Sequence, residues 1–353
     1  MTQLEEIFKS ELKMIGSWHY EPRSPTAIRL DLNESPLPPS PKVIKAALEA
    51  SLSANRYPVE AEIELNARIA KYVNLDPANV VIGNGSDCLI HAIMDATIRP
   101  GDWVLMPSPS FQVFETATLK NGGHVKYVKL NPPGFKVSPD TLLREARGCK
   151  VLVIVNPNNP TGNLVMNRHE IEDVVSSFEG LVVVDEAYYE FSRVTVVDLV
   201  KDYENLVVLR TFSKAFCMAG FRIGYAVASE RVTGFLKRAR QEFPVSAPSL
   251  KAAIAALEDL EYVKYVVSLV EKERKRLYER LRQIEGIEPF PSCTNFILFK
   301  ASRGDIASKL ARRGIFIRDF SKALGRYYFR VTVGLPNENE RFVEELRKIL
   351  EEA

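Results

Sequence analysis

The strongest constraint on this chain is a series of short apolar runs, rich in β-branched residues, between residues 79 and 229. Longer amphipathic stretches separate these runs. Short β-branched runs favour strands, and the stretches between them have helical periodicity. This alternation predicts an α/β fold with a mostly parallel sheet covered by helices on both faces. We expect seven strands, at residues 79–83, 102–106, 124–130, 151–155, 181–185, 205–210 and 225–229.

Polar sequences follow four of the expected strands at the point where each strand ends. The carboxyl ends of parallel strands lie along one edge of a sheet, and ligand crevices form at that edge. The four polar segments are NGSD (84–87), NPNNPTGN (156–163), DEAYYEF (185–191) and TFSK (211–214). We therefore expect a single site to which several loops contribute.

The pattern changes after residue 240. Residues 242–249, EFPVSAPS, include two prolines and predict a linker, and residues 262–283 have the periodicity of one long helix. Two strand-like runs follow, and then a C-terminal helix in which Asn337 and Glu340 resemble a capping box. We expect an N-terminal arm over residues 1–36 that belongs with the small domain, a large domain over 37–243 and a small α+β domain over 244–353.

Composition excludes several classes of function. A formal net charge of +2 gives no basis for binding nucleic acid or an anionic membrane. The four cysteines form no C-x-x-C pair and the four histidines show no ligand spacing, so we expect neither a disulfide framework nor a metal site. The N-terminus lacks the features of a signal peptide, and no apolar run is long enough to span a bilayer. We expect a cytoplasmic protein.

Two ionisable residues occur in sequence that is unusually apolar. Lys214 lies in TFSKAFCMAGFRIGY (211–225), where few other charged groups are present. Desolvation favours the neutral form of a lysine, and a neutral amine can attack a carbonyl to form a Schiff base. Asp185 follows three valines. Its carboxylate could cap the next helix or face a cationic nitrogen of a ligand.

The remaining motifs are ambiguous when each is taken alone. The proline-rich loop at 156–162 could be an ordinary turn, or it could hold its amides in a set geometry. GNGSD (83–87) could be a tight turn or a phosphate-binding helix start, and Arg222 could bind a phosphate or form a structural salt bridge. Together with Lys214 and Asp185, these groups are the parts needed to hold pyridoxal phosphate.

Three of these motifs resemble those of the fold-type I pyridoxal-phosphate aminotransferases, and more narrowly the histidinol-phosphate aminotransferase branch. They are NPNNPTG, DEAYYEF and TFSKAFCMAGFRIGY. Further matches follow the family's order over nearly the whole chain. These are LDLNESPLPPSP (30–41), RYP (56–58), GNGSD (83–87), PSCTNF (291–296), GIFIRD (314–319) and FRVTVG (329–334).

The resemblance implies roles for individual residues. Lys214 would be the catalytic lysine that forms the Schiff base with pyridoxal 5'-phosphate, and Asp185 would keep the pyridine nitrogen protonated. Asn159 and Tyr188 would hydrogen-bond to the ring hydroxyl. The other expected cofactor-binding residues are Phe111, which would stack on the ring, and Ser86, Asp87, Thr211, Ser213 and Arg222, which would hold the phosphate.

The resemblance also implies a homodimer, in which Tyr57 reaches the phosphate of the neighbouring subunit's cofactor. On the substrate side it implies that Arg330 and Arg318 bind anionic groups and that Tyr20 closes over a phosphate. The expected reaction moves an amino group between histidinol phosphate and 2-oxoglutarate, a step of histidine biosynthesis.

Three positions depart from the family's usual pattern and leave the substrate open. Phe111 stands where a stacking tyrosine is usual, Cys88 where an acidic residue is common and Ser35 where asparagine is usual. The alternatives are an aromatic amino-acid aminotransferase and a pyridoxal-phosphate-dependent phosphothreonine decarboxylase. A nicotinamide-dependent dehydrogenase is not favoured, because GNGSDC lacks the third glycine of a dinucleotide-binding turn.

Overall fold

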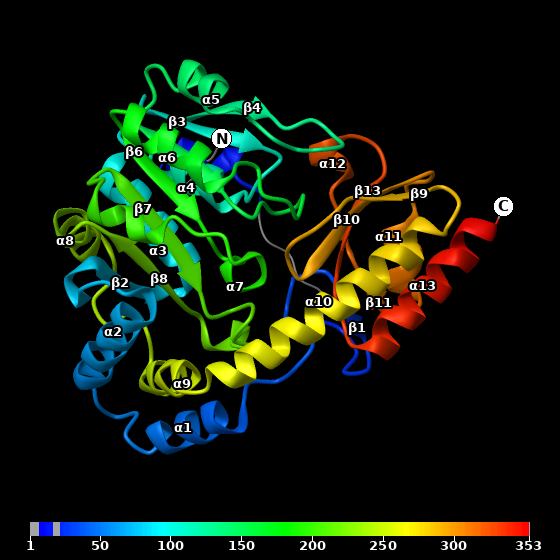
Figure 1. Ribbon diagram of the computed structural model, residues 1–353, viewed down its shortest axis with the longest axis horizontal. Coiled ribbons are helices and arrows are strands. Elements are labelled where there is room, and N and C mark those ends of the chain that lie inside the picture. Colours follow the sequence, from blue (N-terminus) through cyan, green and yellow to red (C-terminus); the bar gives the residue numbers. More distant parts are fainter. Residues whose placement is uncertain (1–6, 17–21, 353) are drawn as a thin grey trace.

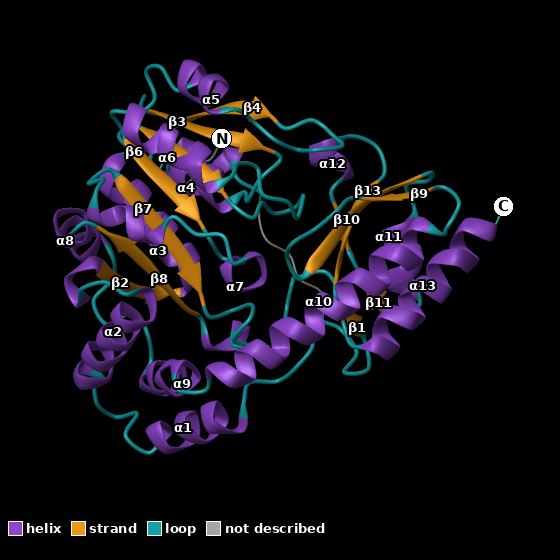
Figure 2. Cartoon of the chain, viewed as in Figure 1, coloured by secondary structure: helices purple, strands orange, loops and turns teal. Residues whose placement is uncertain are grey.

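The computed structural model describes residues 7–16 and 22–352. Within them a large α/β domain is joined to a smaller α+β domain, and the long helix α10 (Leu260–Arg282) runs from one toward the other (Figure 1). Figure 2 shows the strands of the large sheet with helices on either side. The α/β fold expected from the sequence is confirmed. No helix in the described part of the chain is both long and apolar enough to cross a membrane.

The large sheet contains the seven strands that the sequence predicts, with small shifts at their ends. Their order is β2-β8-β7-β6-β5-β3-β4. All neighbouring pairs are parallel except the two that β8 makes, with β2 and with β7. The strands are β2 (Val80–Asn84), β3 (Trp103–Ser108), β4 (His124–Lys129), β5 (Val151–Val155), β6 (Leu181–Asp185), β7 (Leu206–Thr211) and β8 (Ile223–Ala228).

Both faces of the central strands are buried, which explains their continuous runs of apolar residues. In β6, Val182 and Val184 belong to the core cluster on one face and Val183 to the cluster on the other. The α-helices that contribute buried residues to the first cluster are α1 (Pro41–Ser51), α2 (Val59–Val73), α5 (Pro139–Glu145), α6 (Arg168–Ser177), α7 (Tyr189–Ser192), α9 (Ala247–Leu257) and the first half of α10. Those that contribute to the second are α3 (Gly85–Thr97), α4 (Val113–Lys120) and α8 (Glu230–Ala239). Four short 3-10 helices complete this part of the chain: η1 (Ser10–Met14), η2 (Pro77–Asn79), η3 (Val197–Lys201) and η4 (Ala219–Phe221).

The small domain is built on an antiparallel sheet of order β12-β13-β10-β9. Strand β1, from the N-terminal segment, pairs with β11 and so lies against this domain. The elements are β1 (Ile28–Arg29), β9 (Ile287–Pro289), β10 (Phe296–Ala301), β11 (Ile315–Phe316), β12 (Arg318–Asp319), β13 (Tyr328–Thr332), α11 (Ile306–Arg312), α12 (Ser321–Leu324) and α13 (Pro336–Glu351).

Helix α9 begins after the expected linker and packs against α1 and α2 of the large domain. The domain boundary after residue 243 therefore stays a prediction. The expected cap of the C-terminal helix is wrong. Helix α13 begins at Pro336, and Glu338 rather than Glu340 accepts the backbone N–H of Leu335 at 2.7 Å. Proline suits a first helical position because it has no N–H that would be left unpaired there.

Strand β8 and the start of α3 approach so closely that only glycine fits between them. A Cβ atom on Gly224 would lie 2.4 Å from the backbone nitrogen of Ser86. Real Cβ atoms do not come this close to backbone, so a larger residue would push α3 away from the sheet. Gly224 therefore fixes the position of the helix start that carries Ser86 and Asp87.

We expect Gly224→Ala to lower the free energy of unfolding by about 1 to 3 kcal/mol, the usual cost of overpacking a tight site. Gly234→Ala is the matched control. Gly234 lies inside α8, where an added Cβ would have no atom within 4 Å. There alanine should stabilise the protein by about 0.5 to 1 kcal/mol, because it has the better helix propensity. Urea unfolding measures both, and equal effects of the two changes would contradict the proposed contact.

Candidate active site

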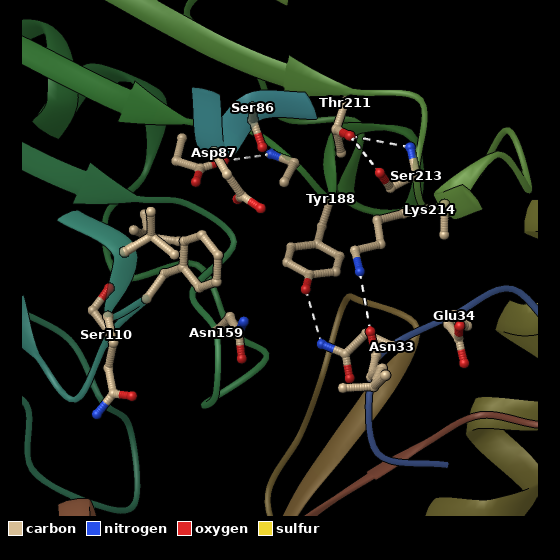
Figure 3. A pocket seen from close by; sticks show the side chains of 18 of the residues that line it. Asn33, Glu34, Ser86, Asp87, Ser110, Asn159, Tyr188, Thr211, Ser213 and Lys214 are labelled. Carbon is tan, nitrogen blue, oxygen red and sulfur yellow. Dashed lines mark hydrogen bonds between the residues drawn. The ribbon is translucent and has the colours of Figure 1, made fainter. Parts of the chain in front are cut away.

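The polar ends of the strands and the small domain enclose a cavity of about 600 Å³. Figure 3 shows part of its lining, in which side chains from the start of α3, the end of β7, the turn after β6 and the loop at residues 31–34 converge. Twelve of the residues expected from the sequence line it: Ser86, Asp87, Phe111, Asn159, Asp185, Tyr188, Thr211, Ser213, Lys214, Arg222, Arg318 and Arg330. The structure thus brings together residues that are more than 240 positions apart in the sequence.

Two expected site residues are not among them. Tyr57 does not line this cavity. Its side chain is 75% exposed and its ring stacks on Phe243 with a centroid distance of 4.7 Å. Tyr20 lies outside the described residues. The roles of both residues stay predictions.

Lys214 lies half-buried in the cavity, just after the end of β7. Its Nζ atom donates a hydrogen bond to the backbone oxygen of Leu32 at 3.2 Å. Burial, and secondarily the positive charge of Arg330, lower the pKa of the Lys214 amine to about 8. A substantial fraction of this amine is therefore neutral near pH 8, which is the form that can act as a nucleophile.

Asp185 ends β6, between β5 and β7, and is almost fully buried. One carboxylate oxygen accepts the backbone N–H of Ala187 at 2.9 Å. Burial raises the pKa of Asp185 to about 7. The following helix, α7, has Tyr188 at its N-cap position. Asp185 is therefore not the cap of that helix, and it is positioned to face a cationic group in the cavity.

One end of the cavity is formed by the start of α3, the end of β7 with the residues that follow it, and Arg222. Arg222 Nη2 lies 3.1 Å from an Asp87 carboxylate oxygen, and Thr211 Oγ1 lies 2.9 Å from Ser213 Oγ. A Cβ atom on Gly85 would lie 2.7 Å from Arg222 Nη2, so glycine is required for the guanidinium to reach this position. Hydroxyl groups, a guanidinium and the N-terminus of a helix are all groups that bind phosphate.

Arg330, on β13 of the small domain, contacts both the large domain and the loop at residues 31–34. Arg330 Nη1 donates to Asn159 Oδ1, and Arg330 Nη2 donates to the backbone oxygen of Asp31 at 2.5 Å. Arg330 Nε is buried and has no hydrogen-bond partner among the described residues. Burial lowers the pKa of the Arg330 guanidinium to about 10 and raises the pKa of the Tyr188 phenol to about 12.

Sequence reasoning missed the part that residues 31–34 play in the site. LDLNESP matches the family's pattern, but its residue types by themselves indicate no role for any of its residues. In the structure Asp31, Leu32, Asn33 and Glu34 all line the cavity. The backbone of this loop contacts Lys214 and Arg330, and Asn33 contacts Tyr188. Backbone contacts of this kind leave no pattern in residue types, which is why the sequence did not reveal them.

These groups fit pyridoxal phosphate. The buried carboxylate of Asp185 matches a protonated ring nitrogen, the phosphate-binding groups lie at one end of the cavity, and the Lys214 amine lies between the domains. The fit rests on the chemistry of the donors. No group of three or more His, Cys, Asp or Glu side chains in the described ranges could hold a metal ion.

The sequence model of the family described as aminotransferase class I and II matches residues 25–346. The chain belongs to this family. It is 38% identical to histidinol-phosphate aminotransferase 2 of Archaeoglobus fulgidus, over 91% of this chain and 93% of that protein. It is 37% identical to histidinol-phosphate aminotransferase of Thermoanaerobacter pseudethanolicus, over 98% of this chain and 99% of that protein.

Among solved structures, the chain is similar to histidinol-phosphate aminotransferase from Sinorhizobium meliloti in complex with pyridoxal-5'-phosphate. The TM-score is 0.86 at 26% sequence identity, covering 92% of this chain and 91% of that one. The expected family, fold and cofactor are confirmed: the chain is a pyridoxal-phosphate-dependent aminotransferase. When bound, this cofactor supplies an aldehyde for an amine and a ring that withdraws electrons.

We expect uptake of pyridoxal phosphate by the apoprotein to accelerate with rising pH, with a midpoint near 8 rather than near the usual lysine value of 10.5. The reason is that the pKa of Lys214 is lowered in the fold, so the reactive neutral amine appears at lower pH. Arg330→Gln removes a nearby cation and should move this midpoint upward. Stopped-flow absorbance measures the rate.

Two controls belong to this experiment. Lys214→Ala lacks the amine and sets the baseline, and Arg341→Gln removes an exposed arginine of α13. A midpoint that moves equally in Arg330→Gln and Arg341→Gln would show that the charge of Arg330 does not act on Lys214.

Proposed function

We propose that this aminotransferase moves an amino group between histidinol phosphate and 2-oxoglutarate, a step of histidine biosynthesis. The observation that carries the proposal is the placement of Arg318 and Arg330. These two residues face each other across β12 and β13, and both line the cavity that contains Lys214. The names of the relatives, at 37 to 38% identity over most of each chain, support the same substrate.

The two arginines suit an enzyme whose amino donor and amino acceptor end in different anionic groups. Histidinol phosphate carries a phosphate, and 2-oxoglutarate carries a carboxylate at the corresponding end. A guanidinium fork binds both kinds of anion bidentately. Arg330 Nε, which has no partner among the described residues, is one donor available for such a ligand. The rings of Phe296 and Phe320, 5.3 and 5.2 Å from the Arg330 guanidinium carbon, hold the guanidinium in place.

The site residues have the following roles in this proposal. Lys214 bonds to the cofactor and carries a proton to and from the substrate carbon. Asp185 holds the proton on the ring nitrogen, and Asn159 and Tyr188 bind the ring hydroxyl. Phe111 stacks on the ring, and Arg318, Arg330 and Tyr20 bind the substrate. The phosphate of the cofactor is held by Ser86, Asp87, Thr211, Ser213 and Arg222.

The proposal includes a homodimer in which Tyr57 completes the neighbouring subunit's site. Exposed apolar side chains on the helices that precede and follow Tyr57 in the chain support it. Ile44 and Leu48 of α1 and its C-cap residue Leu52 recur at four-residue intervals, and Leu48 and Leu52 are 66% and 89% exposed. Ile63 of α2 is 66% exposed. Apolar side chains gathered on one surface in this way are typical of an interface. We propose a cytoplasmic location, which the four free cysteines support.

We expect histidinol phosphate to convert the bound cofactor to its aminated form, and 2-oxoglutarate to restore it. Arg318→Gln should weaken binding of histidinol phosphate by roughly 10- to 100-fold, because it removes a charge-assisted hydrogen bond. The same variant should change the reaction with phenylalanine much less, because phenylalanine lacks the second anionic group. Single-turnover absorbance measures each half-reaction.

Other donors distinguish the alternatives. Phenylalanine that reacts faster than histidinol phosphate would favour an aromatic amino-acid aminotransferase. Carbon dioxide released from phosphothreonine, without amino transfer to 2-oxoglutarate, would favour a decarboxylase.

We expect a mixture of Lys214→Ala and Tyr57→Phe subunits to form hybrid dimers in which one of the two sites has neither defect. Tyr57→Phe alone should weaken cofactor binding about tenfold, because one phosphate hydrogen bond is lost. Phenylalanine keeps the ring that stacks on Phe243. After subunit exchange, a fraction of sites should regain wild-type affinity. If the mixture behaves as the sum of its two parts, Tyr57 does not act across an interface.

A further inference from the structure

Asn33 is held inside the cavity by residues from the C-terminal part of the chain. Its backbone N–H donates to Thr332 Oγ1 at 3.0 Å, and its backbone oxygen accepts from Asn295 Nδ2 at 3.0 Å. All three residues are buried. The φ angle of Asn33 is 53°, in the left-handed region that asparagine and glycine tolerate best. The position of its side chain is therefore fixed by the fold.

The hydrogen bonds of Asn33 also fix which end of its side-chain amide faces which neighbour. Thr332 Oγ1 accepts the Asn33 N–H, so the Thr332 hydroxyl hydrogen is free to donate to Asn33 Oδ1, 3.2 Å away. The amide oxygen consequently faces Thr332, and the NH₂ group faces Tyr188. Asn33 Nδ2 lies 2.8 Å from the Tyr188 hydroxyl oxygen (Figure 3). An amide NH₂ group donates hydrogen bonds and does not accept them.

This arrangement determines the direction of the Tyr188 hydroxyl hydrogen. The hydroxyl oxygen accepts from Asn33, so its single hydrogen must point away from Asn33. No other hydrogen bond of this hydroxyl occurs within the described parts of the chain, and Tyr188 lines the cavity. The available direction for the hydrogen is toward the cavity.

We propose that Asn33 is a positioning residue that turns the hydroxyl hydrogen of Tyr188 toward the ring hydroxyl oxygen of pyridoxal phosphate. The inference rests on the proposed role of Tyr188 and adds to it the group that orients its donor. Asparagine suits this position because it supplies a donor and tolerates a positive φ angle. Aspartate would have the same shape but would accept a hydrogen bond from Tyr188, which would turn the hydrogen away from the cofactor.

The test is a double-mutant cycle on cofactor affinity. Asn33→Gly removes the amide without adding charge, and it keeps the backbone unstrained because glycine accepts a positive φ angle. We expect Asn33→Gly and Tyr188→Phe each to weaken binding of pyridoxal phosphate about tenfold, the effect of one lost hydrogen bond. The double variant should also be weakened about tenfold, because Asn33 acts only through Tyr188. Fluorescence quenching measures the dissociation constants.

A role of Asn33 that is only structural predicts a different result. The two losses would then multiply to about a hundredfold in the double variant. That outcome, or wild-type affinity in Asn33→Gly, would overturn the inference while leaving the proposed function intact. If Tyr188→Phe binds the cofactor like wild type, the proposed role of Tyr188 is wrong and the inference falls with it.

Two further measurements separate orientation from loosening of the loop. Asn33→Asp keeps the side-chain shape and should weaken binding of pyridoxal phosphate as Asn33→Gly does. The effect of its added charge is measured separately, by making the same change in the Tyr188→Phe background. The pH midpoint of the visible band of the bound cofactor should shift in the same direction in Asn33→Gly and Tyr188→Phe. A midpoint that shifts in Tyr188→Phe but not in Asn33→Gly would contradict the inference.

Discussion

The desolvation of Lys214 and Asp185 in one cavity is the constraint on which the rest of the structure depends. Burial makes the charged form of each group costly, which lowers the pKa of the lysine amine and raises that of the carboxyl group. Neither side chain forms a short ion pair with another residue in the described ranges. Both are therefore available to a ligand that brings an aldehyde and a cationic nitrogen.

The neighbour of Asp185 shows what a buried carboxylate needs when it serves only the fold. Glu186 faces the other side of the sheet and accepts hydrogen bonds from Arg210 at 3.0 and 2.8 Å. It also accepts from the Thr195 hydroxyl and the Val196 N–H. Glu186 is fully satisfied by protein groups, whereas Asp185 has a single backbone donor. Of these two adjacent residues at the end of β6, Glu186 therefore stabilises the fold and Asp185 is available to a ligand.

The cavity exists only because the small domain and the N-terminal loop close over the edge of the large sheet. The backbone of Leu32 accepts from Lys214, and the backbone of Asp31 accepts from Arg330. The pairing of β1 with β11 anchors the start of this loop. Residues near both ends of the chain therefore contribute to the surroundings of a lysine near its middle. For this reason, substitutions in the small domain should change the pKa of Lys214.

The sequence by itself determined the seven strands and the place of Lys214 and Asp185 at strand ends, because buried β-branched runs and isolated ionisable residues leave clear patterns. It also indicated the cofactor, because the donor types in the loops match it. Tertiary structure decided that Asp185 is not a helix cap and that Asn33 contacts Tyr188. It also showed that Tyr57 does not line the cavity of its own chain. Those facts depend on distances between segments and on backbone atoms, which every residue shares and which no local pattern encodes.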